Sequence, residues 1–399
     1  MLRKIVVEKL YLFLIILAIG LWSALNMLQM EQDGLAGSDD SLLLKLLLGV
    51  IFVLVSGYLL VNYKYVHMGW MGRVLCVLSV YMAIARMAVL PPTVGALSYI
   101  YQPMRDVVVV LFFLFTSTLA AKSDELKDFF ATWIIVGMLI IAYFFLQNWR
   151  FMNAVDEAHM GTAYWILFLM PILLHTPHKW LRYAGLILVG AILFASFKRG
   201  GILAFGCGLL AYLFVKEILI GRKFTKLIFF VIAIMALAIV FIVVDNALDN
   251  LFTERFMNIK DDGGSGRDQV WATTWRMIQQ SEFEHLLFGH GHNSVLTNSP
   301  LRLSAHNDFL ECIYDFGLFG SLFYFMLHIS LIRQIFRNIR LRNPEAAIMA
   351  FTYSFFLILS LMSHVLIYPW LAFMGLSWGM GCAGERKALN LGKNDEVYD

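Results

Sequence analysis

Long apolar stretches alternate with short polar connections along almost the whole chain. About twelve stretches are long and apolar enough to predict membrane-spanning helices, at residues 10–30, 42–62, 74–90, 104–121, 129–147, 162–176, 180–197, 200–220, 225–245, 309–332, 346–364 and 367–383. The sixth stretch is short, and only a turn near Tyr368 and Pro369 separates the last two. The pattern therefore predicts an all-α, polytopic integral membrane protein with about twelve transmembrane helices.

One long segment interrupts this alternation between the ninth and tenth predicted spans. Residues 246–305 mix charged, glycine-rich and apolar pieces, and a connection of this length is usually functional. After "DDGGSGRDQ", Val270, Thr274, Met277 and Ile278 recur with helical spacing, which predicts an amphipathic helix near the membrane surface. No Gly/Ser- or Pro-rich linker divides the chain, so we expect residues 1–399 to form one membrane domain, with 246–305 as part of its active site.

The distribution of basic residues predicts the orientation of these helices. Most of the 31 lysines and arginines fall at the N-terminus, in every second connection and at the C-terminus. The positive-inside rule then places both termini in the cytoplasm and the segment 246–305 on the opposite, non-cytoplasmic side. The N-terminus has a basic start and a long apolar run without a small-residue cleavage site, so we expect a retained signal anchor.

Composition agrees with a protein built for lipid. The chain is 60% hydrophobic and 15% charged, with a mean hydropathy of +0.72, far from the balance of a soluble domain. Its four cysteines are scattered without a C-x-x-C motif, so we interpret them as small hydrophobic residues. We expect membrane lipids, not nucleic acid, among its partners.

Five polar residues could carry chemistry on the periplasmic face. Lys198 and Arg199 lie in "SFKRGG", at the joint of the seventh and eighth spans, against the positive-inside bias; Arg267, Arg302 and His306 follow further along the chain. Arginines suit a phosphate or diphosphate, and histidine suits proton transfer near neutral pH. The alternatives are lysine and arginine side chains reaching to lipid headgroups, solvated loop charges, and a histidine that caps a helix.

Further residues are weaker candidates for substrate binding. Arg86 and Arg105 lie toward the periplasmic ends of their spans and could hold phosphate oxygens or reach to headgroups. Trp271 could stack against a sugar or anchor the helix at the membrane interface. Gly200, beside Arg199, would let a bulky headgroup approach the backbone closely.

Two other groups of polar residues have structural alternatives. "EFEHLLFGHGHNS" could contribute histidines to a metal site, but its ligand set is incomplete, so we predict a glycine-rich turn and no metal. Asp308 and Glu311 follow His306 and could orient its imidazole, or they could simply favour the start of a helix.

Three motifs together resemble one family. "SFKRGG", the loop pieces "GSGRDQVW" and "LFGHGHNS", and "SAHNDFLECIYDFGLFG" are similar to the O-antigen ligase/polymerase superfamily of bacterial membrane glycosyltransferases. The resemblance is concentrated in residues 190–325, and the first half of the chain matches only as a run of spans. Lys198 departs from the family pattern, in which a small or polar residue is more usual.

The resemblance implies a function. Ligases of this family transfer a glycan from undecaprenyl diphosphate to lipid A–core oligosaccharide at the periplasmic face of the inner membrane, and polymerases transfer it to another lipid-linked repeat unit. Neither uses a metal, nucleotide or other cofactor. The resemblance assigns the diphosphate to Arg199 and Arg267 and the role of base to His306. A lipid or anion transporter is the alternative from another class, although no repeat symmetry is visible.

Overall fold

The computed structural model describes residues 2–32, 41–89, 96–151, 162–196, 199–221, 228, 263–366 and 370–395. Regular structure in these residues is helical throughout. The elements are α1 (Leu2–Gln32), α2 (Leu42–Val61), η2 (Tyr63–Tyr65), α3 (Gly69–Val89), α4 (Ala96–Lys122), α5 (Asp124–Phe151), α6 (Thr162–Leu173), α7 (Lys179–Ala195), α8 (Arg199–Ile220), α11 (Gly263–Gln279), α12 (Phe283–Phe288), α13 (Ser294–Asn298), α14 (Asp308–Arg340), α15 (Glu345–Met362) and α16 (Trp370–Asp395).

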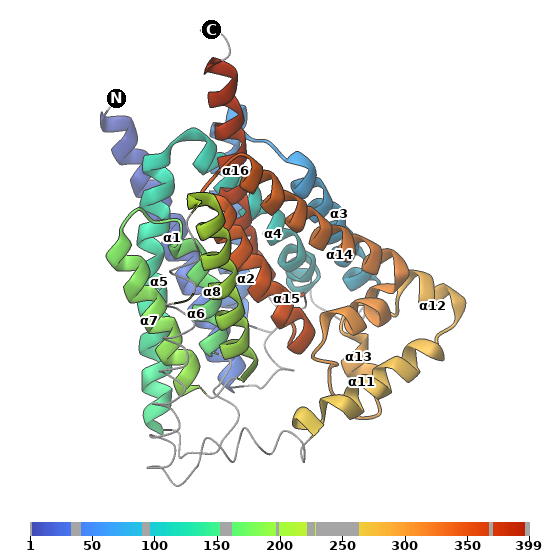
Figure 1. The fold of residues 1–399 in the computed structure, drawn as a ribbon. Coiled ribbons are helices and arrows are strands. Elements are labelled where there is room, and N and C mark those ends of the chain that lie inside the picture. The colour runs from blue at the N-terminus through green and yellow to red at the C-terminus, as the bar shows by residue number, and fades with distance from the viewer. Residues whose placement is uncertain are drawn as a thin grey trace.

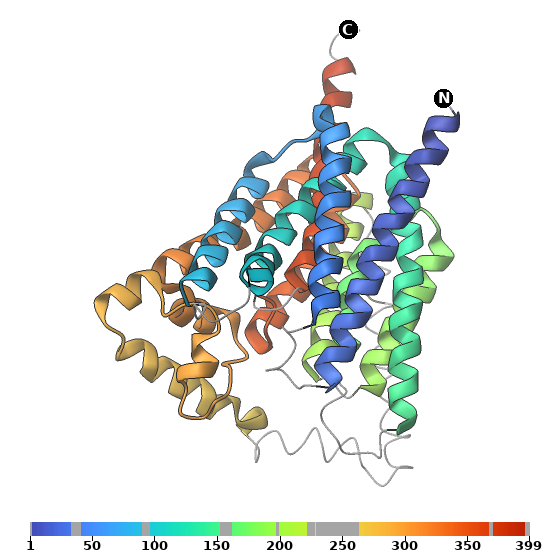
Figure 2. The ribbon, with the colours of Figure 1, turned by 180° about the vertical axis from the view of Figure 1, so that it is seen from behind.

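The long helices lie side by side in one bundle, and the two termini lie at the same end of it (Figures 1 and 2). The short helices α11, α12 and α13 gather near the opposite end, beside the start of α14 (Figure 1). We call these the termini end and the loop end. This arrangement agrees with an even number of crossings and with a loop placed away from both termini.

The predicted spans coincide with α1–α8 and α14–α16, and the ninth, 225–245, lies outside the described residues. Eight of the described helices are long and apolar enough to cross a membrane: α1 to α5, α8, α14 and α15. The predicted sixth span yields only the 12 residues of α6, because the chain turns after Leu173. The chain is therefore an all-helical membrane protein, while the number twelve stays a prediction.

Aromatic residues join the helices at the centre of the bundle. Phe373 on α16 contacts Trp22 on α1 and Trp165 on α6, with ring centroids 6.1 and 5.5 Å apart. All three side chains are fully buried. The four cysteines are free, and Cys312 is buried in this apolar interior, as small hydrophobic residues would be.

Ion pairs between helices concentrate toward the termini end, where the sequence predicts an excess of basic residues. They join α1 to α4 and α5, α5 to α15, and α14 to α16, through the pairs Lys122–Glu8, Lys9–Glu125, Lys127–Glu345 and Arg337–Glu385. Carboxylates from neighbouring helices therefore neutralise part of the positive charge that the sequence assigns to the cytoplasm.

The helix α14 is interrupted at Gly317, whose φ of 66° is left-handed. The break leaves carbonyl groups of the preceding turn without helical partners, and the chain after α12 uses them. His290 N–H donates to the carbonyl of Tyr314 at 3.0 Å, and Gly291 N–H donates to that of Asp315 at 2.9 Å. The Tyr81 hydroxyl on α3 lies 2.9 Å from the carbonyl oxygen of Phe316. These bonds fasten the loop end to α14 and α3.

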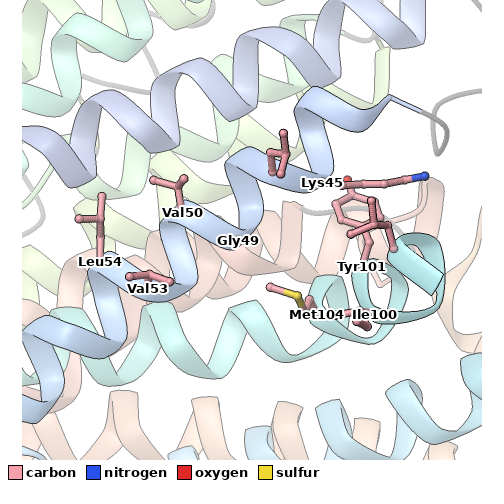
Figure 3. Close-up of a pocket in the computed structure, with 10 residues that line it drawn as sticks. Lys45, Gly49, Val50, Val53, Leu54, Ile100, Tyr101 and Met104 are labelled. Atoms are coloured by element: carbon pink, nitrogen blue, oxygen red, sulfur yellow. The ribbon is translucent and has the colours of Figure 1, made fainter.

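An apolar groove of about 470 Å³ lies between α2 and α4 (Figure 3). Lys45 stands at one end and Leu54 at the other, with Gly49, Val50, Val53 and Met104 among the residues between them. None of the residues that line it is a predicted site residue. It is therefore a hollow in the flank of the bundle that is separate from the candidate chemistry.

The requirement for glycine at the break in α14 can be tested by adding one methyl group, in the variant Gly317→Ala. A Cβ at residue 317 would strike the carbonyl oxygen of Leu287, and alanine disfavours a positive φ. We expect Gly317→Ala to lower the free energy of unfolding by about 3 kcal/mol, seen as a lower melting temperature in detergent. Gly206→Ala is the control, because a Cβ there meets no atom within 4 Å and favours the helix. Equal melting temperatures for the two variants would contradict the assigned role of Gly317.

Candidate active site

The start of α14 holds the backbone of His306 in an unusual conformation. Asn307 caps the helix, and its side-chain oxygen accepts hydrogen bonds from the backbone N–H groups of Phe309 (3.0 Å) and Leu310 (3.2 Å). His306, just before the cap, has a φ of 51°. Its own N–H donates to Oε1 of Glu311 at 3.2 Å. The first turn of α14 therefore fixes the chain direction at His306.

Asp308, Glu311 and Asp315 form a carboxylate face on α14. Their spacing of three and four residues places them on the same side of the helix, and all three are at most 1% exposed. Asp308 accepts hydrogen bonds from the N–H groups of Val365 and Leu366, at 3.1 and 3.2 Å. Each of these acids binds a different part of the loop end, since a buried carboxylate needs donors.

Asp315 and Glu311 complete this arrangement. The carboxylate of Asp315 accepts from the N–H groups of Asn293 (2.7 Å) and Val295 (2.9 Å) at the start of α13. Glu311 divides its two oxygens between the N–H of His306 and the ring of His364, whose Nδ1 lies 2.9 Å from Oε2. The carboxylate face thus ties α13, the His306 turn and the chain after α15 to one helix.

His364 is brought against His306. The two ring centroids lie 4.2 Å apart, and His364 is 3% exposed. Burial, together with the positive charge of Arg267, lowers the pKa of His364 to about 3. His364 is therefore neutral throughout the physiological pH range.

Arg267 lies near the start of α11, directly after Gly266, and is half-buried. Its charge acts on both His364 and Tyr164 of α6, so it belongs to the same neighbourhood. The predicted amphipathic helix is confirmed as α11, but its apolar side packs on the start of α14. Ile278 joins a small buried cluster with Val295, Ala305 and Tyr314.

Trp271 supports the turn that carries His306. Its indole N–H donates to the carbonyl oxygen of Ala305 at 2.8 Å, and its ring packs against the same small cluster. Trp275, one turn later on α11, is 49% exposed. Of the two tryptophans, Trp271 thus links the helix of Arg267 to the histidine by a direct hydrogen bond.

The start of α8 lies near Tyr164 and the end of α15, beside His364. Gly200 is so close to Tyr164 that a Cβ there would lie 3.6 Å from the tyrosine hydroxyl and 3.8 Å from Cβ of Met362. The Tyr164 hydroxyl in turn shares a hydrogen bond with Ser363, next to His364. Arg199 is the first residue of α8, so its backbone is adjacent to Gly200, while Lys198 lies outside the described residues.

The remaining predicted binding residues have contacts of their own. Arg86 is buried and paired with both oxygens of Asp106, at 2.8 and 2.9 Å, and with Gln102 at 2.9 Å. Arg105 lies over the ring of Tyr101, at 5.9 Å. Arg302 is exposed on a turn, with a φ of 51°. Arg86 therefore acts first as half of an internal ion pair.

The histidine-rich motif forms the glycine-rich turn that the sequence predicts, with positive φ at Gly289, Gly291 and Asn293. His290 bonds Ser281 at 2.9 Å, and burial lowers its pKa. Burial and the charges of Arg86 and Arg105 hold the pKa of His292 well below its ordinary value. Among the described residues, no group of three or more His, Cys, Asp or Glu side chains is arranged to hold a metal ion.

Sequence reasoning missed His364, Tyr164 and Ser363. His364 carried a usable signal, because a histidine at the loop-end limit of an apolar span is a functional candidate by default. Tyr164 and Ser363 carried none, since a tyrosine and a serine in apolar stretches are unremarkable. Only the packing of α6 against the end of α15 brings them to the site.

Comparison with known proteins agrees with this assembly. Residues 184–325, from within α7 to within α14, match the family model described as O-antigen ligase. This stretch contains Arg199, Arg267 and His306, and the match agrees with the resemblance of their motifs to the O-antigen ligase/polymerase superfamily. A search of curated proteins finds no match.

The carboxylate face makes a testable claim about stability. We expect Asp308→Ala to lower the free energy of unfolding by about 3 kcal/mol, because the buried N–H groups of Val365 and Leu366 lose their acceptor. Asp308→Asn retains one acceptor oxygen and should lose less. Thermal unfolding in detergent measures both, and Glu284→Ala, at an exposed acid on α12, should change stability by less than about 0.5 kcal/mol. A melting temperature for Asp308→Ala equal to that of Glu284→Ala would overturn the claim.

Proposed function

We propose that this protein is a glycosyltransferase that transfers a glycan from undecaprenyl diphosphate to lipid A–core oligosaccharide at the periplasmic face of the bacterial inner membrane. One observation carries the proposal. Arg267, His306, His364, Tyr164 and the start of α8 converge at the loop end although they lie far apart in the sequence. The family match supports an O-antigen ligase or polymerase.

Each group has a defined task in the proposed reaction. Arg199 and Arg267 bind the donor diphosphate and stabilise its negative charge as the bond between the sugar C1 and the diphosphate oxygen breaks. His306 removes the proton from the acceptor hydroxyl, whose oxygen forms the new bond to C1 from the opposite face. The products are the glycosylated acceptor, with inverted configuration at C1, and undecaprenyl diphosphate.

The residues around His306 favour its role as the base. His364 is held neutral, so His306 is the imidazole of the pair that is suited to accept a proton. Asp308 and Glu311 are engaged with backbone N–H groups and with His364 and are not placed as metal ligands. The proposed chemistry therefore relies on arginine and histidine alone, as in the family that the motifs resemble.

Loss of the proposed base or of a diphosphate ligand should remove activity but leave the protein folded. We expect His306→Ala to lower kcat about 10²–10⁴-fold and Arg199→Ala or Arg267→Ala about 10²-fold. The measurement is transfer in vitro from undecaprenyl-diphosphate-linked glycan to purified lipid A–core.

Arg276→Ala is the matched control for Arg267→Ala. Arg276 lies on the same helix, is exposed, and donates hydrogen bonds to Ala272 (3.3 Å) and Thr273 (3.4 Å) within α11. Near-normal glycan ladders from the His306 or Arg199 variants would reject the assignment. If wild-type protein extends a lipid-linked repeat unit and leaves lipid A–core unmodified, the protein is a polymerase of the same family.

The proposed orientation predicts which residues face the periplasm. In a background with the four native cysteines replaced by alanine, a membrane-impermeant maleimide should label Trp275→Cys in intact cells. It should label Arg340→Cys only after the inner membrane is opened. Both positions are exposed, one at the loop end and one near the end of α14 at the termini end. The reverse labelling pattern would place the site in the cytoplasm.

A further inference from the structure

We propose that His364 and Glu311 are positioning residues for His306, and that they hold its ring and stabilise its protonated form. This inference rests on the proposed function, because it concerns how the base of that reaction works. It adds a second histidine and a carboxylate to the residues that the motifs identify. Three contacts join α14, the His306 turn and the chain after α15.

The first contact fixes the backbone of His306. Oε1 of Glu311 accepts the N–H of His306 at 3.2 Å, where the chain has a φ of 51°. A non-glycine residue in this conformation needs such support, because left-handed backbone is disfavoured. The direction in which the side chain of His306 leaves the chain therefore depends on Glu311.

The second contact fixes the ring of His364. Oε2 of the same carboxyl group lies 2.9 Å from Nδ1 of His364, within hydrogen-bond distance. Asp308 holds the following residues, Val365 and Leu366, by their N–H groups. Two acids on one helix thus determine the place of His364.

The third contact joins the two imidazoles. Their ring centroids are 4.2 Å apart and the rings are tilted by 43°. His364 therefore contacts both the ring of His306 and the carboxyl group of Glu311. When His306 takes the acceptor proton, its positive charge forms beside a carboxyl group that can carry a negative charge, an arrangement that favours the charged form.

Other charged groups act on the same pair from neighbouring elements. Arg267 on α11 opposes a positive charge on His364, and Asp308 on α14 accepts from the N–H groups of the next two residues. Tyr164 on α6 shares a hydrogen bond with Ser363, beside His364. Glu311 is the acid that bonds both the His306 backbone and the His364 ring, which makes it the point at which to test the effect.

The pH profile of kcat distinguishes this role from a purely structural one. Glu311→Gln keeps a carbonyl acceptor for the His306 N–H but removes the group that can ionise beside the two rings. Without a group that can take a negative charge when His306 gains its proton, protonated His306 is less stable and its pKa is lower, so the free base persists to lower pH. We expect the acid limb of the profile to move to lower pH and the plateau value of kcat to fall about tenfold to a hundredfold. The KM for the donor should change little.

His364 has a matched control in the same membrane region. His364→Phe keeps a ring beside His306 but cannot bond Glu311, and we expect a similar loss of kcat. His328→Phe makes the same change at another buried histidine, whose ring packs on Phe309, Tyr324 and Phe356, and a phenylalanine ring preserves that packing. It should leave kcat and the pH profile unchanged. His364→Asn, whose amide can still donate to Glu311, should retain more activity than His364→Phe.

The outcomes separate the two proposals. Wild-type protein that transfers no glycan to any acceptor rejects the proposed function itself. Active wild-type protein with an unshifted acid limb in Glu311→Gln rejects the positioning role alone. The same holds if His364→Phe and His328→Phe lose equal activity, since folding would then explain both. Melting temperatures of all four variants in detergent show which of them are folded.

Discussion

A carboxylate buried in an apolar helix bundle must receive hydrogen bonds, and α14 carries three such acids on one face. Asp308, Glu311 and Asp315 obtain their donors from segments that are otherwise unrelated: the chain after α15, the turn at His306 and the start of α13. Each bond also satisfies the backbone N–H group that donates it, because N–H groups in turns at the edge of a membrane have few other acceptors. One helix face therefore organises the loop end.

This organisation explains how the candidate residues, which are distant in the sequence, come together in the fold. Trp271 fastens α11 to the carbonyl before His306, and Tyr164 joins the start of α8 to the end of α15. Such an arrangement needs little of a ligand's binding free energy to order its loops. It makes the free energy of folding less favourable instead, through the burial of three acids and through strained backbone at His306.

The sequence predicts the helices well and the site in part. Periodicity and hydropathy locate α1–α8 and α14–α16, because lipid allows few structures other than apolar helices. The helix at Arg267 and the turn around His290 are also predicted, since both have local signals. His364 and Tyr164 were not identified, because their proximity to His306 arises from packing between helices that no local pattern encodes. For the same reason the sequence did not identify Asp106 as the partner of Arg86: the two residues lie on different helices, and only the fold brings them together.

The interruption of α14 at Gly317 also bears on how the protein meets membranes of different thickness. A transmembrane helix adapts to the bilayer by tilting, and in a continuous helix that tilt would carry every residue along with it. At Gly317 the helical path is broken, and the preceding turn bonds instead to the chain after α12 and to Tyr81. The two parts of α14 nevertheless stay packed on each other, because the Tyr324 hydroxyl lies 3.2 Å from Oδ2 of Asp308 and the ring of Phe309 lies 5.4 Å from that of His328. A tilt of the span would therefore carry the acids with it.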